Sequence, residues 1–116
     1  MPNPYISGTG HFLPPRVVTN VDLSKYMDTT DEWIQERTGI KERCYVDAGV
    51  GPSDLAIPAT EQALIAANLK VSDIDFIIFA TSTPDFYAPG SGCLLQEKMS
   101  FNKIGALDIR MQCSGF

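Results

Sequence analysis

The chain has few basic residues, and it lacks any long apolar run. Its 116 residues include 9 Lys and Arg against 14 Asp and Glu, which gives a formal net charge of −5. Recognition of nucleic acid or of an anionic membrane surface needs a clustered excess of basic side chains, so this balance argues against both. A membrane-spanning helix needs about 18 or more consecutive apolar residues, and none is present. We therefore expect no nucleic-acid partner and no membrane partner.

Cysteine is scarce, and the N-terminal residues do not resemble a secretion signal. Cys44, Cys93 and Cys113 are an odd number at wide spacings without a C-x-x-C pair. This pattern suits neither a disulfide framework nor a zinc site. The first residues lack the basic and apolar regions of a signal peptide. We expect a cytoplasmic protein that holds no metal and carries free thiols, at least one of which can react.

The order of apolar patterns predicts a layered α/β fold. Residues 74–80 are almost continuously apolar, as in a strand covered on both faces. Thr30 is expected to cap a helix that starts at Asp31 and ends at Gly39. In a helix that opens at Ser53, Pro58 should bend the helix or delay its start. The other expected elements are strands at residues 5–10, 40–46 and 104–111 and helices at 21–27 (capped by Asn20), 53–68 and 93–99.

Cys113 is a candidate nucleophile at the end of the chain. It follows the last expected strand and precedes the small residues Ser114 and Gly115. A helix that begins here would lower the thiol pKa and would offer backbone N–H groups to an oxyanion. Buried, inert cysteines are common, so the segment alone does not separate a nucleophile from a core residue.

Trp33 and Arg37 form a candidate nucleotide-binding pair. They are four residues apart in an expected helix and therefore share one face. An aromatic ring and a guanidinium in this arrangement can hold a base and a phosphate. The alternative is a tryptophan packed in the core beside a solvated cation.

These segments together resemble the N-terminal part of the β-ketoacyl-acyl-carrier-protein synthase III family, within the thiolase-like superfamily. The matching motifs occur in order over the whole chain, which makes the resemblance specific. They are Gly8-Thr9-Gly10 with Leu13-Pro14, Thr19-Asn20 with Asp22-Leu23, Asp31-Glu32-Trp33-Ile34 through Arg37-Thr38-Gly39-Ile40, the residues 77–82, and Cys113-Ser114-Gly115-Phe116. We therefore expect residues 1–116 to be the first βαβαβ half of a thiolase-like α/β/α sandwich, truncated just after the nucleophile.

The resemblance implies an acyltransferase that starts fatty-acid biosynthesis. In the family, the cysteine that matches Cys113 takes an acyl group from acyl-CoA and then passes it to a carbanion made by decarboxylation of malonyl-acyl carrier protein. Trp33 matches the residue that stacks on the CoA adenine, and Thr29 and Arg37 match positions at the nucleotide end of the CoA tunnel. The implied partners are acyl-CoA as substrate, with no separate cofactor, the malonyl-acyl carrier protein and a second subunit in a homodimer.

Two features of the resemblance leave alternatives open. The family's catalytic His and Asn lie far downstream, and His11 is in the wrong place to replace them, so this chain alone should not complete the reaction. Ala88 stands where short-chain relatives have a Phe in the acyl pocket, which leaves the starter acyl group open. The alternatives are a condensing enzyme of secondary metabolism, such as one that primes quinolone or polyketide synthesis, and a non-catalytic half-fold.

Overall fold

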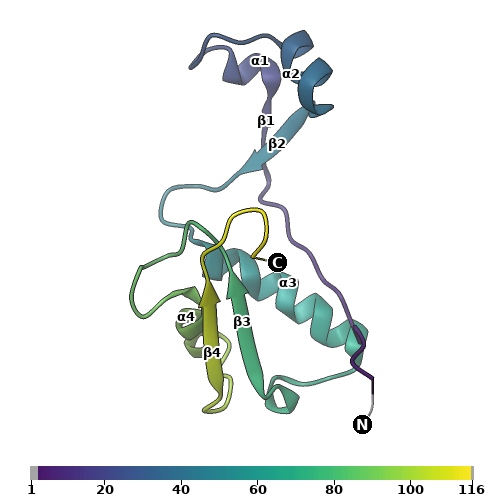
Figure 1. Ribbon diagram of the computed structural model, residues 1–116, viewed down its shortest axis with the longest axis vertical. Helices are drawn as coiled ribbons and strands as arrows, with labels where there is room; N and C mark the ends of the chain where they lie inside the picture. The colour runs from purple at the N-terminus through teal and green to yellow at the C-terminus, as the bar shows by residue number, and fades with distance from the viewer. Residues whose placement is uncertain (1–2, 116) are drawn as a thin grey trace. The chain divides into compact units, whose positions relative to one another are not determined.

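The computed structural model describes residues 3–115, and the chain forms two compact units (Figure 1). The first, called here the sheet unit, comprises residues 1–12 and 50–116. The second, called here the hairpin unit, comprises residues 13–49. Each unit has a two-stranded sheet of its own, so each is described separately. No helix within residues 3–115 has the length and apolar character that crossing a membrane requires.

The sheet unit is built on two parallel strands. Strand β3 (Phe76–Ala80) pairs with β4 (Gly105–Ile109), so their carboxyl ends meet at the same edge of the sheet (Figure 1). Helix α4 (Ser91–Lys98) connects them and contacts both strands and α3 (Pro52–Ala67). A 3₁₀ turn, η1 (Val71–Asp73), follows α3. The strand–helix–strand order is the one that the apolar patterns predict, and a parallel pair needs such a crossover.

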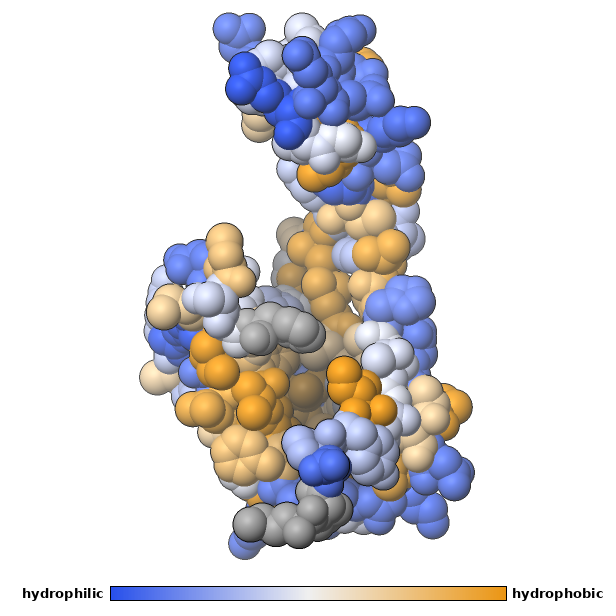
Figure 2. Space-filling model, turned by 45° about the vertical axis from the view of Figure 1, so that its right-hand side comes forward, coloured by the Kyte–Doolittle hydropathy of each residue, from blue (hydrophilic) through white to orange (hydrophobic). Residues whose placement is uncertain are grey.

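Only one face of this sheet is covered within the described residues. On the covered face, Ile77 is 7% exposed, and Leu95 of α4 is also buried. On the opposite face Phe76, Ile78 and Leu107 are each at least half exposed. Figure 2 shows hydrophobic side chains gathered on one side of this unit. A strand as apolar as β3 is typical of a sheet with helices on both faces, so this face has the composition of an interior surface.

The hairpin unit is held by an antiparallel pair. Strand β1 (Arg16–Thr19) pairs with β2 (Glu42–Tyr45). The helices α1 (Asn20–Leu23) and α2 (Asp31–Thr38) lie between the two strands in the sequence. Val18 and Ile34 are its buried apolar side chains. The strand predicted at residues 40–46 is thus confirmed as β2, but its partner β1 was not predicted.

The expected strand at residues 5–10 is wrong. The segment pairs with no strand of the described residues and instead runs against α3. A Cβ atom at Gly8 would overlap the carbonyl of Ala63, and one at Gly10 would overlap that of Ala59. The two glycines therefore allow the backbone to pack closely against a helix of small residues, and they do not belong to a β-strand.

The expected helices are confirmed, with corrections to the length and N-cap of α1 and to the effect of Pro58 on α3. Helix α1 is a single turn that ends at Leu23, and its N-cap is Thr19, whose hydroxyl accepts from the N–H of Asp22 at 3.2 Å. Asn20 does not cap it because its side chain bonds elsewhere. Helix α2 has the predicted ends: Thr30 accepts from the N–H of Trp33, and Gly39 has φ 71°. Helix α3 begins at Pro52 and continues through Pro58, so its start is not delayed.

Candidate functional site

Cys113 lies in a turn that begins three residues after the end of β4. Its side chain is exposed and its thiol is free, so it is not a buried cysteine of the core. A Cβ at Gly115 would overlap the carbonyl of Met111, which shows how tightly the turn closes around Cys113. The predicted strand-to-turn junction is confirmed, although β4 ends at Ile109, before the predicted end. The helix expected to begin at Cys113 is not formed within the described residues, in which 112–114 are a turn, and Phe116 lies outside them.

The loop of residues 81–90 follows β3 at the same edge of the sheet. Ligands of open α/β sheets bind outside the carboxyl ends of the strands, so this loop and the Cys113 turn are expected to border one site. Arg110, between β4 and Cys113, donates a hydrogen bond to the carbonyl of Tyr87, and its guanidinium lies 5.0 Å from the centre of the Tyr87 ring. The segment before the thiol thereby holds the tip of the loop.

Asp85 anchors the other part of this loop to two helices. Its carboxylate accepts from the Ser53 N–H at 3.1 Å and from the Ser53 hydroxyl at 2.8 Å, in the first turn of α3. Its own N–H donates to the Ser91 hydroxyl at 3.0 Å, where α4 begins. Ser53 and Ser91 are fully buried, and Lys98 also donates to the Ser53 hydroxyl. Sequence analysis missed this cluster, although polar side chains so deeply buried must find partners.

The surroundings of Asp85 set its ionisation. Burial acts to raise the pKa of this carboxyl, but the hydroxyls of Ser91 and Ser53 and the Ser53 N–H favour the ionised form more strongly. The net result is a pKa below the ordinary value of 3.8. The folded state therefore binds the proton less readily than the unfolded chain does.

Asp85→Asn is expected to destabilise the protein by about 1–2 kcal/mol at neutral pH, because a charged hydrogen-bond acceptor is lost. The stabilisation by Asp85 is complete above its unfolded pKa near 3.8 and is lost as the pH falls toward the lower folded value. Urea unfolding of both proteins at several pH values between 3 and 7 should show curves that converge in acid. A constant difference across this range would contradict the ionised state of Asp85.

Thr29, Trp33 and Arg37 gather around α2 in the hairpin unit. The Arg37 guanidinium lies 5.6 Å from the centre of the Trp33 ring, and Trp33 is 54% exposed. Trp33 is therefore not packed in the core of residues 3–115, in which Ile34 is the residue that α2 buries. Thr29 and Trp33 help to line a hollow of about 240 Å³. The Thr29 hydroxyl is buried without a hydrogen-bond partner among residues 3–115.

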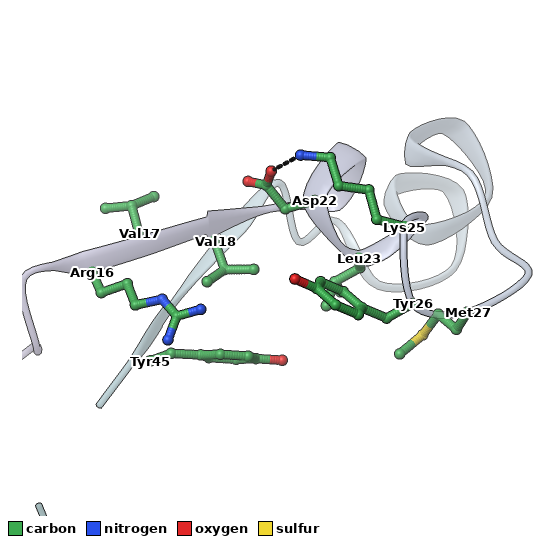
Figure 3. A pocket seen from close by; sticks show the side chains of 9 residues that line it. All are labelled: Arg16, Val17, Val18, Asp22, Leu23, Lys25, Tyr26, Met27 and Tyr45. Carbon is green, nitrogen blue, oxygen red and sulfur yellow. Dashed lines mark hydrogen bonds and ion pairs between the residues drawn. The ribbon is translucent and has the colours of Figure 1, made fainter. Parts of the chain in front are cut away.

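The hairpin unit has a second, larger hollow of about 580 Å³ (Figure 3). Strand β1, helix α1 with the turn after it and Tyr45 of β2 line it. Arg16 lies over the Tyr45 ring, with 5.9 Å between its guanidinium carbon and the ring centre. The ammonium group of Lys25 pairs with the carboxylate of Asp22 at 2.7 Å, so both of these charges already have a partner. None of the four predicted site residues lines this hollow.

The structure thus groups three predicted residues in one unit and places Cys113 in the other. Thr29, Trp33 and Arg37 belong to the hairpin unit, and Cys113 to the sheet unit. Asn20, predicted as a helix cap, is a further residue of the hairpin unit, and the cap is instead Thr19. Asn20 is 1% exposed and bonds to Asp31, Ile40 and Arg43.

Comparison with known proteins gives a consistent set of relatives. No protein-family model matches the chain. The chain is 50% identical over 111 residues to a β-ketoacyl-[acyl-carrier-protein] synthase III of Caldanaerobacter subterraneus, and 47% identical over 111 residues to one of Xylella fastidiosa. These matches cover 96% of this chain and 34% of each relative, so the chain spans about a third of the length of those proteins.

Solved structures show the same fold. The chain matches the 3-oxoacyl-[acyl-carrier-protein] synthase III of Aquifex aeolicus with a TM-score of 0.88 at 45% identity, over 96% of this chain and 36% of that one. It matches the priming β-ketosynthase of the R1128 polyketide pathway with a TM-score of 0.88 at 27% identity, over 96% of this chain and 33% of that one. The predicted α/β fold class is confirmed by these matches.

Proposed function

The chain is homologous to the N-terminal third of β-ketoacyl-acyl-carrier-protein synthase III, and on this premise we propose that it supplies the acyl-accepting part of a condensing enzyme that uses acyl-CoA and malonyl-acyl carrier protein. Residues 1–116 are then the first part of a thiolase-like domain. The assembled enzyme acts in the cytoplasm as a homodimer and starts fatty-acid synthesis.

Cys113 is the proposed nucleophile. Its thiolate attacks the carbonyl carbon of the acyl-CoA thioester, a new C–S bond forms, and CoA leaves as a thiolate that takes up a proton. The backbone N–H of Cys113 is one donor to the oxyanion that forms in between. The acyl group then passes to the carbanion that arises when malonyl-acyl carrier protein loses CO₂. The observation that carries this proposal is the exposed, free thiol in the turn after a parallel strand.

Mapping of the acylated peptide tests the assignment. The protein is incubated with radiolabelled acetyl-CoA, quenched at low pH and digested with a protease. Label on the peptide that contains Cys113 supports the proposal. Label on Cys44 or Cys93 with Cys113 unmodified would refute it.

Trp33, Arg37 and Thr29 are the proposed contacts of the CoA nucleotide. The exposed Trp33 ring is free to stack on adenine, and Arg37 beside it carries the charge that a phosphate needs. Thr29 lines the same hollow as Trp33, and its hydroxyl has no hydrogen-bond partner among residues 3–115. The CoA moiety is a part of the substrate, and the proposal requires no resident cofactor.

Trp33→Ala is expected to weaken CoA binding by about 5- to 150-fold, because stacking of a base on an aromatic ring is worth about 1–3 kcal/mol. Equilibrium binding of CoA by calorimetry measures this. Tyr45→Ala is the matched control, since Tyr45 is also an exposed aromatic residue under an arginine in the same unit. Equal losses in both variants, or a loss of thermal stability in Trp33→Ala with unchanged affinity, would contradict the proposed contact.

A second candidate function is priming of a secondary-metabolite pathway. The observation in its favour is the match to the priming β-ketosynthase of the R1128 polyketide pathway. Both functions use the same acyl-cysteine step, so they differ in which carrier protein delivers the malonyl group. Steady-state rates with the carrier protein of fatty-acid synthesis and with a polyketide carrier protein distinguish the two.

A further inference from the structure

We propose that Asn20 is the positioning residue of the nucleotide-binding helix: its amide group holds α2 at both ends and so sets where Trp33 and Arg37 lie. This inference rests on the proposed function, because it concerns the same CoA contacts. It assigns a role to a residue that touches neither the proposed nucleophile nor the proposed nucleotide contacts.

The Asn20 side chain is almost completely buried and fully bonded. It is 1% exposed. Its Nδ2 donates to the carboxylate of Asp31 at 2.7 Å and to the carbonyl of Ile40 at 2.8 Å. Its Oδ1 accepts from Arg43 at 2.6 Å. Both amide hydrogens and the amide oxygen are therefore in use, and a buried amide in this state has one orientation only.

The positions of these partners make the contact a clamp on α2. Asp31 is the first residue of α2, and Ile40 follows Gly39, the residue that ends it. One side chain thus fixes both ends of an eight-residue helix, with Trp33 and Arg37 between them. Gln35, one turn into the helix, also donates to Asp31 at 2.8 Å. Arg43 extends the clamp to β1 through the carbonyl of Val18 at 3.2 Å.

Apolar packing alone does little to fix the rotation of α2 about its own axis. Ile34 is the only residue of the helix that is buried. A helix with one buried apolar side chain can rotate about its axis at little cost. Such a rotation would move Trp33 and Arg37 out of the positions in which both can contact the same ligand. Directional hydrogen bonds at both ends remove that freedom, which is how preorganisation raises affinity.

The electrostatics of Asp31 agree with this arrangement. The amide of Asn20 and then that of Gln35 lower the pKa of the Asp31 carboxyl, so it stays ionised. An ionised carboxylate in the first turn of α2 also complements the positive end of the helix dipole.

The test compares CoA binding in variants that keep or break the clamp. Trp33 is the only tryptophan of the chain, so quenching of its fluorescence by CoA reports stacking directly. Asn20→Asp keeps the shape of the side chain but removes both of its N–H donors. It also places the new carboxylate opposite that of Asp31. We expect it to bind CoA at least about fivefold more weakly, as when much of one stacking contact is lost. The double variant Asn20→Asp with Asp31→Asn restores a donor and an acceptor and should regain most of the affinity.

Thr19→Ala is the control for a purely structural role. It removes the cap of α1 but none of the hydrogen bonds of the Asn20 side chain and none of α2, so it should lower the melting temperature without a change in CoA affinity. If Asn20→Asp does not fold, Asp31→Ala replaces it, because alanine accepts no hydrogen bond from Asn20 at the start of α2. Wild-type affinity in the folded clamp variant, or no rescue in the double variant, would overturn the inference. Absence of CoA binding by the unmodified protein would instead overturn the proposed nucleotide site.

Discussion

Cys113→Ala is expected to abolish acyl transfer from acyl-CoA. Covalent catalysis needs a sulfur that forms the thioester, and alanine supplies no nucleophile, so the step has no alternative route at this position. Loss of a sole nucleophile commonly costs several orders of magnitude in rate. Chromatographic measurement of released CoA, together with the intact mass of the protein, detects both products of the step. We expect neither free CoA nor an acylated protein.

The other two cysteines provide the controls. Cys93 is exposed like Cys113, so Cys93→Ala tests whether accessibility alone makes a thiol reactive. Cys44 is half-buried in β2, and Cys44→Ala tests a thiol of the other unit. Both variants should become acylated at the wild-type rate. Acylation that persists in Cys113→Ala and disappears only when Cys93 is also replaced would assign the chemistry to Cys93.

Local patterns were enough to predict the elements that depend on local interactions. The ends of α2 follow from the Thr30 cap and the left-handed Gly39, both within the helix's own sequence. Strand β3 follows from its apolar run. The expected strand at residues 5–10 failed because a strand exists only with a partner, and Gly8 and Gly10 instead allow the backbone to lie on α3.

The candidate site likewise contains local contacts, which the sequence predicts, and contacts between distant residues, which it does not. Trp33 and Arg37 are one helical turn apart, so their contact is fixed by the helix itself. The clamp of Asn20 and the anchor of Asp85 join residues that are distant in sequence, and no local pattern encodes such pairs. Asn20 and Asp31 are 11 positions apart, and Ser53 and Asp85 are 32 apart. A short polar residue that turns out to be fully buried is the signal that identifies such a group, and it becomes visible only with the fold.

Residues 1–116 without any further chain are expected to show no condensation of acyl-CoA with malonyl-acyl carrier protein. The chain spans about a third of the length of its curated relatives, and its single histidine, His11, is exposed. Decarboxylation of a malonyl group needs donors that stabilise the charge developing on the thioester oxygen. Among residues 3–115, no second layer covers the apolar face formed by Phe76, Ile78 and Leu107, although such a strand normally has one.

The expected result is thus a separation of the two half-reactions in this polypeptide. Mass spectrometry should detect at most one acyl group per chain, since Cys113 is present, while release of ¹⁴CO₂ from labelled malonyl-acyl carrier protein stays at the background rate. The matched control is a synthase III of full length from one of the curated relatives, which should release CO₂ in the same assay. Sedimentation and thermal melting report whether the open apolar face makes the polypeptide self-associate. A monomer that melts cooperatively and releases CO₂ over many turnovers would contradict the prediction, because it would place the decarboxylating groups within these 116 residues.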